Sequence, residues 1–208
     1  MYTLFYSPHA CSLASHIALA ESGLPYEVRR VNFAENEQRS AEYLKHNPNG
    51  RVPALVTERG TLIENPAILA FVAQAAPLAR LAPLDDPIEF ARMQGFNSFI
   101  ASSLHVAYAH NKRGYRWADG QEALEAMKRK VVPNMHMYFG MVENDFLKGP
   151  WVLGEAYSVA DAYLFTMSEW LEGLGIDINE FPRVADHFRR MNERPAVRQA
   201  IAAERPGD

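Results

Sequence analysis

The sequence contains a single cysteine, Cys11, whose position suggests thiol chemistry. It follows a short extended run that ends at Ser7-Pro8, and it opens a stretch with apolar residues at helical spacing. The free amides at a helix N-terminus favour thiolate over thiol, so a reactive cysteine is one prediction. A cysteine that only packs beneath the turn is the alternative, because free cysteines are often buried. The neighbouring Ser12 is either a hydroxyl nucleophile or an ordinary helix cap.

One cysteine cannot form an internal disulfide, a Cys-x-x-Cys redox pair or a cysteine-rich zinc site. His9 and Cys11 offer two metal ligands without a convincing third, and the seven histidines are scattered, so we predict no metal site. The lack of disulfides favours a reducing compartment. The first basic residue is Arg29, which argues against a secretory signal, and we expect a cytoplasmic protein.

Two further segments have the chemistry to bind a peptide-like ligand. An X-Pro bond is usually trans, but a cis bond at Val52-Pro53 would present the Val52 amide and carbonyl to an extended peptide. Asn65 suits the N-cap of a helix, whose N-terminus attracts a carboxylate, and Glu64 before it can bind an ammonium group. Considered alone, Glu64 and Asn65 are more simply interpreted as a solvated glutamate beside a helix cap.

The elements that must position these residues fall into two halves with different patterns. The first half alternates extended and helical runs in the order β-α-β-α-β-β-α, with strands expected at 2–6, 27–33, 52–56 and 60–63. The second half is helical, with runs expected at 88–110, 122–146, 158–174, 184–192 and 196–203. We therefore predict an α/β domain over 1–77, a proline-rich linker over 78–86 and an all-helical domain over 87–208.

Two local signals refine the helical half. Pro133 should kink or split the second long helix, because proline removes a backbone donor and clashes with the preceding turn. Ser158 and Asp161 have the spacing of a capping box, which fixes the start of the next helix.

The composition limits the class of protein. Of 208 residues, 48% are apolar and 22% are charged, which is typical of a folded protein with a sizeable core. The net charge is −4 and the longest basic block is Lys128-Arg129-Lys130, so nucleic acid and anionic membranes are disfavoured as partners. The most apolar stretch, 67–84, is broken by polar residues and prolines, so no membrane span is predicted.

Taken in order, these motifs resemble the cytosolic glutathione S-transferase family, and above all its bacterial beta class. The segments that carry the resemblance are 4–16 (LFYSPHACSLASH), 47–55 (NPNGRVPAL), 62–68 (LIENPAI), 100–105 (IASSLH), 158–165 (SVADAYLF) and 191–195 (MNERP). The resemblance implies a thioredoxin-like N-terminal domain that binds glutathione and a helical domain that shapes the pocket for a hydrophobic electrophile. It also implies a homodimeric transferase that serves in detoxification.

The resemblance assigns roles to individual residues. Cys11 and His105 form the catalytic pair beside the glutathione sulfur, with which Cys11 can form a mixed disulfide. Pro53 is cis, Val52 pairs with the tripeptide backbone, and the residues at 64–65 hold its γ-glutamyl end. The glutathione-binding set that the resemblance implies is Cys11, Arg51, Val52, Pro53, Glu64, Asn65, Ser98, Ser102 and His105.

The sequence departs from the beta-class pattern at four places, one of which is Asn65, where a small serine or glycine is usual. Val106 stands where the class has a lysine, and Ser98 where it has an asparagine. A further lysine, expected after the second strand, is replaced by the stretch 35–37 (ENE), whose acids would repel the glycine carboxylate. Two alternatives to the transferase follow: a thiol-disulfide or peroxide reductase that works through a Cys11 mixed disulfide, and a non-enzymatic scaffold. The electrophile pocket is expected near Tyr108, Tyr115 and Trp117.

Overall fold

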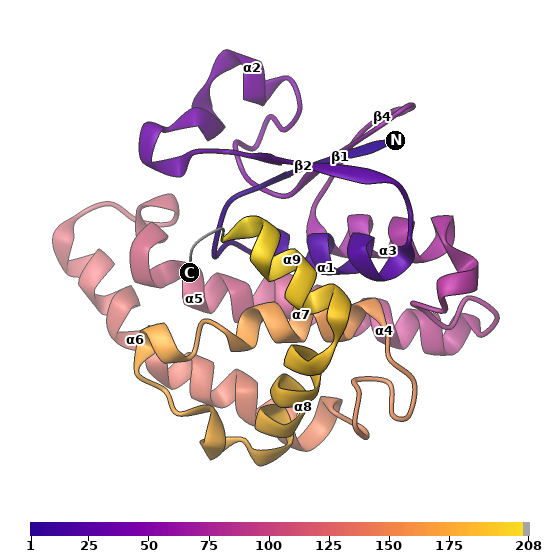
Figure 1. Ribbon diagram of the computed structural model, residues 1–208. Coiled ribbons are helices and arrows are strands. Elements are labelled where there is room, and N and C mark those ends of the chain that lie inside the picture. The colour runs from indigo at the N-terminus through magenta and orange to yellow at the C-terminus, as the bar shows by residue number, and fades with distance from the viewer. Residues whose placement is uncertain (206–208) are drawn as a thin grey trace.

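The N-terminal half is built on a four-stranded sheet in the computed structural model, which describes residues 1–205. The last residues of the predicted helical domain, 206–208, lie outside the described residues. The sheet has the order β2-β1-β3-β4, and its strands are β1 (Tyr2–Tyr6), β2 (Tyr26–Arg30), β3 (Ala54–Thr57) and β4 (Gly60–Ile63). β1 is parallel to β2 and antiparallel to β3, and β3 and β4 form a hairpin (Figure 1).

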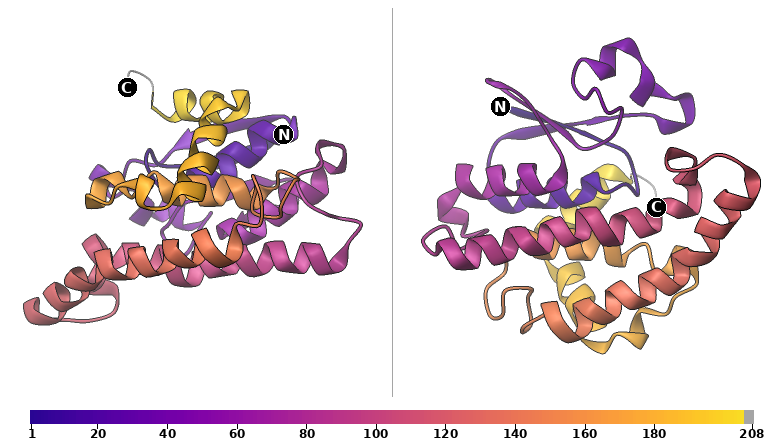
Figure 2. Two further views of the ribbon diagram at one scale, coloured as in Figure 1. Left: turned by 90° about the horizontal axis from the view of Figure 1, so that it is seen from below. Right: turned by 180° about the vertical axis from the view of Figure 1, so that it is seen from behind.

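Helices α1 (Ser12–Ser22) and α3 (Asn65–Ala75) lie side by side against one face of this sheet, and the short α2 (Ala41–Leu44) lies on the opposite side (Figures 1 and 2). α1 ends at Gly23, whose left-handed φ of 70° suits a residue without a side chain. The residues 12–19 are all buried, because α1 also packs against helices of the second half. This βαβαββα order is the thioredoxin-like domain that the sequence predicts.

Apart from an isolated β-bridge between Trp151 and Gly154, the regular elements of the second half, as far as residue 205, are helices. Its helices are α4 (Pro87–Phe99), α5 (His105–Arg113), α6 (Gln121–Met141), α7 (Val159–Ser168), α8 (Pro182–Glu193) and α9 (Pro195–Glu204). A π-helical turn at Ile100–Leu104 joins α4 to α5 without a break, and α6 returns beside this long rod (Figure 2). The predicted combination of a thioredoxin-like and an all-helical domain is thus confirmed. Among the described residues, no helix has the length and apolarity to cross a bilayer.

Some predicted boundaries are wrong for identifiable reasons. β3 begins at Ala54 instead of Val52, because the proline at 53 has no amide to donate to the neighbouring strand. α6 runs unbroken through Pro133, so the expected split does not occur. α7 stops at Ser168, and the apolar pattern continues through a turn and a 3₁₀ turn at Glu172–Leu174.

The capping box at the start of α7 is confirmed and is fully buried. The Asp161 carboxylate accepts hydrogen bonds from the Ser158 amide at 2.8 Å and from the Val152 amide at 2.8 Å. His187 Nε2 on α8 lies 3.1 Å from the same carboxylate. Asp161 therefore joins the loop before α7, the helix itself and α8 at a single point.

The two halves share one hydrophobic core. It combines residues of the sheet and its helices, such as Leu4 and Ile68, with Met93, Phe139 and Leu164 of the helical half. Because interiors are closely packed, this common core fixes the halves relative to each other, and with them any site at their boundary.

Candidate functional site

A cleft of about 520 Å³ lies between the two halves, at the start of α1. Its N-terminal wall includes the Pro8, His9 and Cys11 turn, residues of the segment after β2, and Arg51 and Val52; its other wall is α5 and the turn that follows. A smaller hollow of about 100 Å³ adjoins it and is lined by Pro53, Glu64, Asn65 and Tyr163. Cys11, Arg51, Val52 and His105 line both spaces, so the two form a continuous site.

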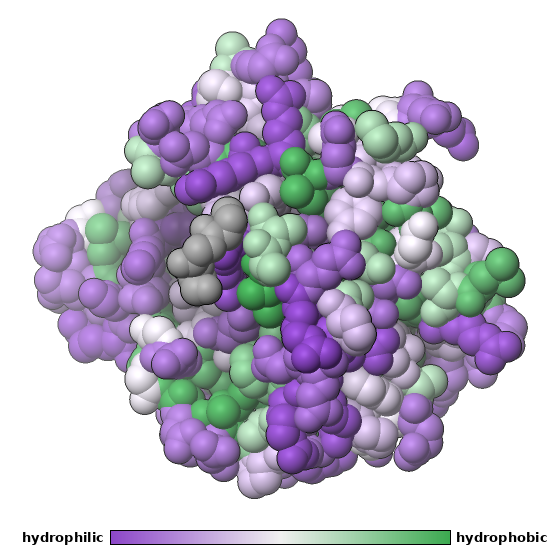
Figure 3. Space-filling model, viewed as in Figure 1, coloured by the Kyte–Doolittle hydropathy of each residue, from purple (hydrophilic) through white to green (hydrophobic). Residues whose placement is uncertain are grey.

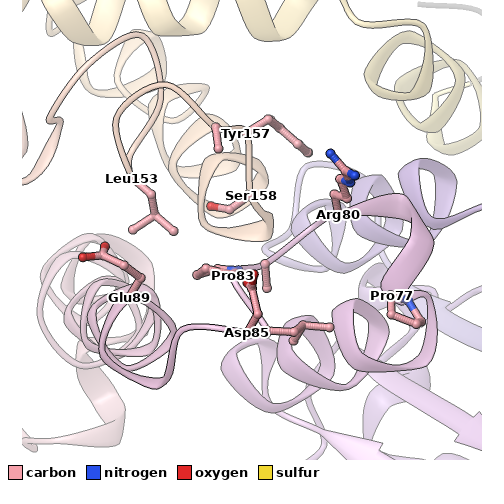
Figure 4. Close-up of a pocket in the computed structure, with 11 residues that line it drawn as sticks. Pro77, Arg80, Pro83, Asp85, Glu89, Leu153, Tyr157 and Ser158 are labelled. Atoms are coloured by element: carbon pink, nitrogen blue, oxygen red, sulfur yellow. The ribbon is translucent and has the colours of Figure 1, made fainter.

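A larger hollow of about 690 Å³ lies elsewhere, between the linker and the loop before α7. Figure 4 shows Leu153, Tyr157 and Ser158 facing Pro83 and Asp85 across it. Neither a cysteine nor a histidine lines this hollow. The chemistry therefore points to the smaller cleft at Cys11 as the functional site.

Cys11 is the residue just before α1, and its Sγ donates a hydrogen bond to the Val52 carbonyl at 3.4 Å. Burial raises the pKa of this thiol to about 11, although the nearby Arg113 acts in the opposite direction. Desolvation thus outweighs the amides at the helix start and favours the neutral thiol over the expected thiolate. Cys11 enters the cleft as a neutral thiol that can donate a hydrogen bond.

The Val52-Pro53 peptide bond is cis. The general preference for trans thus fails here, and the cis bond implied by the family resemblance is confirmed. The Arg51 carbonyl just before it accepts a 2.7 Å hydrogen bond from Asn47 Nδ2 and another from the Tyr43 hydroxyl. These bonds hold the loop that carries Val52 against the rest of the domain.

Glu64 and Asn65 lie at the start of α3, which begins one residue earlier than the predicted cap at Asn65 implies. Glu64 precedes the helix with a left-handed φ of 69°, which is unusual for a residue other than glycine. Asn65 is the first helical residue, and its buried side chain donates to the Cys11 carbonyl at 2.8 Å and accepts from Ser15 Oγ at 2.6 Å. The prediction of Asn65 as the N-cap is therefore wrong: its side chain fastens α3 to the start of α1.

His105 begins α5 and faces the cleft beside Arg113, a residue the sequence analysis did not select. Arg113 Nη2 lies 3.4 Å from His105 Nε2, which must be the acceptor, because a guanidinium has only donors. Burial, together with the positive charges of Arg113, Arg51 and Arg116, lowers the pKa of His105 to about 3, so the ring is neutral. The position of Arg113, two helical turns after His105, is the signal that could have found it.

Trp170 is a second residue that the sequence analysis missed. Its Nε1 donates to the His9 carbonyl at 3.2 Å, which joins the helical half to the turn that leads to Cys11. Its ring meets His105 edge to face at 5.1 Å and stacks on Tyr108 at 4.3 Å between centroids. Because Trp170 is distant in sequence from all of these, no local pattern could have revealed it.

The segment after β2 also differs from its expected role. Glu35 and Glu37 do not line the cleft, and the Glu37 carboxylate accepts the Asn32 amide at 2.7 Å. Arg39 lines the cleft instead and packs over Gly50, where a Cβ would lie 2.9 Å from Arg39 Nη1. The segment thus brings a cation to the cleft, while its two glutamates lie outside the cleft lining.

Some of the other predicted residues line the cleft or the hollow, and others lie outside both. Ser12 is fully buried and bonds to the Ser7 backbone, so it has a structural role and is not a nucleophile in the cleft. Ser98 and Ser102 are exposed on the rod outside both spaces, where the Ser102 hydroxyl donates to the Ser98 carbonyl at 2.8 Å. Tyr108 and Tyr115 line the cleft as expected, whereas Val106 and Trp117 line the adjoining hollow.

Comparison with known proteins agrees with this architecture. Residues 1–74 match the family model of the glutathione S-transferase N-terminal domain, and residues 96–195 match that of the C-terminal domain. Glutathione S-transferase GstA of Escherichia coli O157:H7 is 34% identical over 205 residues, which cover 97% of this chain and 98% of GstA.

Two solved structures are also similar. The crystal structure of a glutathione transferase homolog from Sulfitobacter with bound glutathione is 43% identical, with a TM-score of 0.93 and 96% of both chains covered. A bacterial beta class glutathione S-transferase of Sphingomonas chungbukensis is 36% identical, with a TM-score of 0.84 over 97% of this chain and 98% of its own. The chain therefore belongs to the glutathione S-transferase family.

Proposed function

We propose that this protein is a glutathione transferase of the beta class that binds glutathione along the N-terminal wall of the cleft. The observation that carries this proposal is the meeting of Cys11, the cis Val52-Pro53 bond and His105 in one site. In this arrangement the Val52 backbone pairs with the tripeptide, and the hollow beside Glu64 and Asn65 receives its γ-glutamyl end.

Two further assignments differ in their support. Arg39 replaces the lysine that the beta class has after the second strand, and it binds the glycine carboxylate in this proposal. Ser98 and Ser102 belong to the predicted binding set on the family resemblance alone, since neither lines the cleft or the hollow.

The reaction requires the glutathione sulfur to be anionic near neutral pH. The thiol proton passes to solvent, the sulfur forms a bond to an electrophilic carbon, and the leaving group departs with its electron pair. The positive charges of Arg51 and Arg113 stabilise the sulfur anion, and the neutral Cys11 thiol donates a hydrogen bond to it. His105, with a pKa of about 3, is a weak base and acts through hydrogen bonding.

The low acidity of Cys11 favours conjugation over a reductase that begins with attack by this cysteine. At a pKa of about 11, roughly one Cys11 in ten thousand is a thiolate at pH 7. A mixed disulfide formed by the Cys11 thiolate is therefore slow. The scaffold alternative differs from both, because it requires no glutathione in the cleft.

Calorimetric titration with glutathione, followed by conjugation of 1-chloro-2,4-dinitrobenzene, tests the proposal. We expect Cys11→Ala to retain conjugation within about tenfold, because only one neutral hydrogen bond is lost. The control is Ser102→Ala, which changes an exposed hydroxyl outside the cleft. If calorimetry detects no binding at millimolar glutathione, the proposal is overturned and a non-enzymatic scaffold is favoured. If Cys11→Ala loses disulfide reduction but keeps conjugation, the cysteine serves redox chemistry.

The same proposal includes a homodimer, a cytoplasmic location and a part in detoxification. These rest on the family likeness and, for the location, on the absence of a cysteine pair for a disulfide. Light scattering of the purified protein gives its mass in solution, and a value near 23.4 kDa would contradict the dimer.

A further inference from the structure

The cleft is strongly cationic, although the chain as a whole carries a net charge of −4. Among the residues that the structure describes, its lining includes no aspartate or glutamate, and its cations are Arg39, Arg51, Lys112, Arg113 and Arg116. A concave site lined by charges of one sign concentrates ligands of the opposite sign. The cleft therefore selects for negative charge.

Within residues 1–205, none of these cations forms an ion pair. The ion pairs among the described residues involve other arginines and lysines, and Arg113 has a neutral histidine, His105, as its neighbour. Their positive charge acts within the site, since Arg113, Arg51 and Arg116 all lower the pKa of His105. Unpaired cations in a partly buried wall are costly, and a bound anion would offset that cost.

Glutathione alone does not account for this charge. Its two carboxylates are partly balanced by its own ammonium group, and Arg39 and Arg51 already lie on the wall proposed to bind it. Arg113 acts on the sulfur in the proposed function, so the remaining cations are Lys112 and Arg116, which come from the end of α5 and the turn after it, on the opposite wall. That wall belongs to the helical half, which faces the second substrate in the proposed function.

Aromatic side chains share the wall with these cations. Tyr108 and Trp170 stack on each other in the cleft, and Tyr115, which is 61% exposed, lies between the basic residues in sequence. In Figure 3 the surface around α2 and the nearby end of α5 is mostly hydrophilic, as expected for a mouth flanked by charged residues. The wall thus combines flat rings with positive charge.

We propose that the electrophile is an aromatic or conjugated anion, whose carboxylate is held by Lys112 and Arg116 while its ring packs against Tyr108 and Trp170. This inference rests on the proposed transferase function and replaces the expectation of a purely hydrophobic electrophile. In the reaction with an aryl chloride, the sulfur-carbon bond forms, the carbon-chlorine bond breaks and chloride leaves with the bonding pair. The thiol proton passes to solvent, so no further reactant is needed.

A matched pair of probes tests the charge preference. 4-Chloro-3,5-dinitrobenzoate is anionic and 4-chloro-3,5-dinitrobenzamide is neutral, and each kcat/KM is divided by the uncatalysed rate constant of the same probe. We expect the benzoate to be favoured at least about tenfold, and the preference to shrink as salt is added. Lys112→Gln and Arg116→Gln should each lower kcat/KM for the benzoate about fivefold to tenfold and change the amide less than about twofold.

The control variant is Lys130→Gln, which removes the same charge from an exposed position on α6 outside the cleft. It should leave both probes unchanged. If glutathione binds and the benzoate is not preferred, or if Lys130→Gln lowers the preference as much as Lys112→Gln, the inference is overturned and the transferase proposal stands. If calorimetry detects no glutathione binding, the proposed function itself is lost.

Discussion

Removal of the Asp161 carboxylate should destabilise the protein more than the loss of an ordinary helix cap. Asp161 is fully buried and accepts the amides of Val152 and Ser158, each at 2.8 Å. In Asp161→Ala both amides lose their acceptor in the interior, at about 1–3 kcal/mol each. The free energy of unfolding should therefore fall by about 2–6 kcal/mol, a large share of the ~5–15 kcal/mol typical of a folded domain.

Equilibrium unfolding in urea, followed by circular dichroism, measures this difference. The matched control is Asp86→Ala, because Asp86 caps α4 through the amides of Ile88 at 2.9 Å and Glu89 at 3.1 Å but is exposed. Water can replace the lost acceptor there, so the control should cost only about 1 kcal/mol.

A conservative variant covers the case in which Asp161→Ala does not fold. Asp161→Asn keeps one acceptor oxygen but places its amide group against the Ser158 amide. The Ser158 amide then has no acceptor, and the free energy of unfolding should fall by about 2–3 kcal/mol. An Asp161 variant that costs no more than Asp86→Ala would refute the reasoning, because burial would then have added nothing to the cap.

Three further predictions concern the cleft. The rate of Cys11 alkylation by iodoacetamide should rise steadily from pH 7 to about pH 11, because only the thiolate reacts and burial raises the pKa of the thiol to about 11. A rate that levels off near pH 9 would contradict this. Arg113→Met should raise the pKa of His105 above about 3, because it removes a positive charge that disfavours the imidazolium. NMR titration measures this pKa, and an unchanged value would count against the contact between Arg113 and His105. Trp170→Phe should lower the free energy of unfolding by about 0.5–1.5 kcal/mol in urea, because the bond to the His9 carbonyl is lost while the ring remains; an effect of several kcal/mol would point to repacking instead.

Much of the fold follows from local patterns. The first strand, the hairpin strand at 60–63 and the stop at Gly23 can be predicted because alternation, helical spacing and glycine at a left-handed position are properties of neighbouring residues. The capping box at Ser158 and Asp161 is equally local, and its prediction is confirmed. The family resemblance added the cis bond at Val52-Pro53, which the general preference for trans peptide bonds contradicts.

The roles within the site were less predictable from local patterns. Asn65 has the type of a helix cap, but its side chain is used between α3 and α1, because those helices meet only in the folded chain. Trp170 and Arg39 reach the cleft from segments with no periodic relation to Cys11. Only the packing of the two halves brings them together.

By itself the sequence determined the order of the elements, the position of one thiol at the start of a helix and a chain with a small negative net charge. The tertiary structure decided that this thiol is neutral and that the cleft around it is positive. The reason is physical: periodicity depends on adjacent residues, whereas desolvation and electrostatic potential depend on every group that the fold brings near, including those far along the chain.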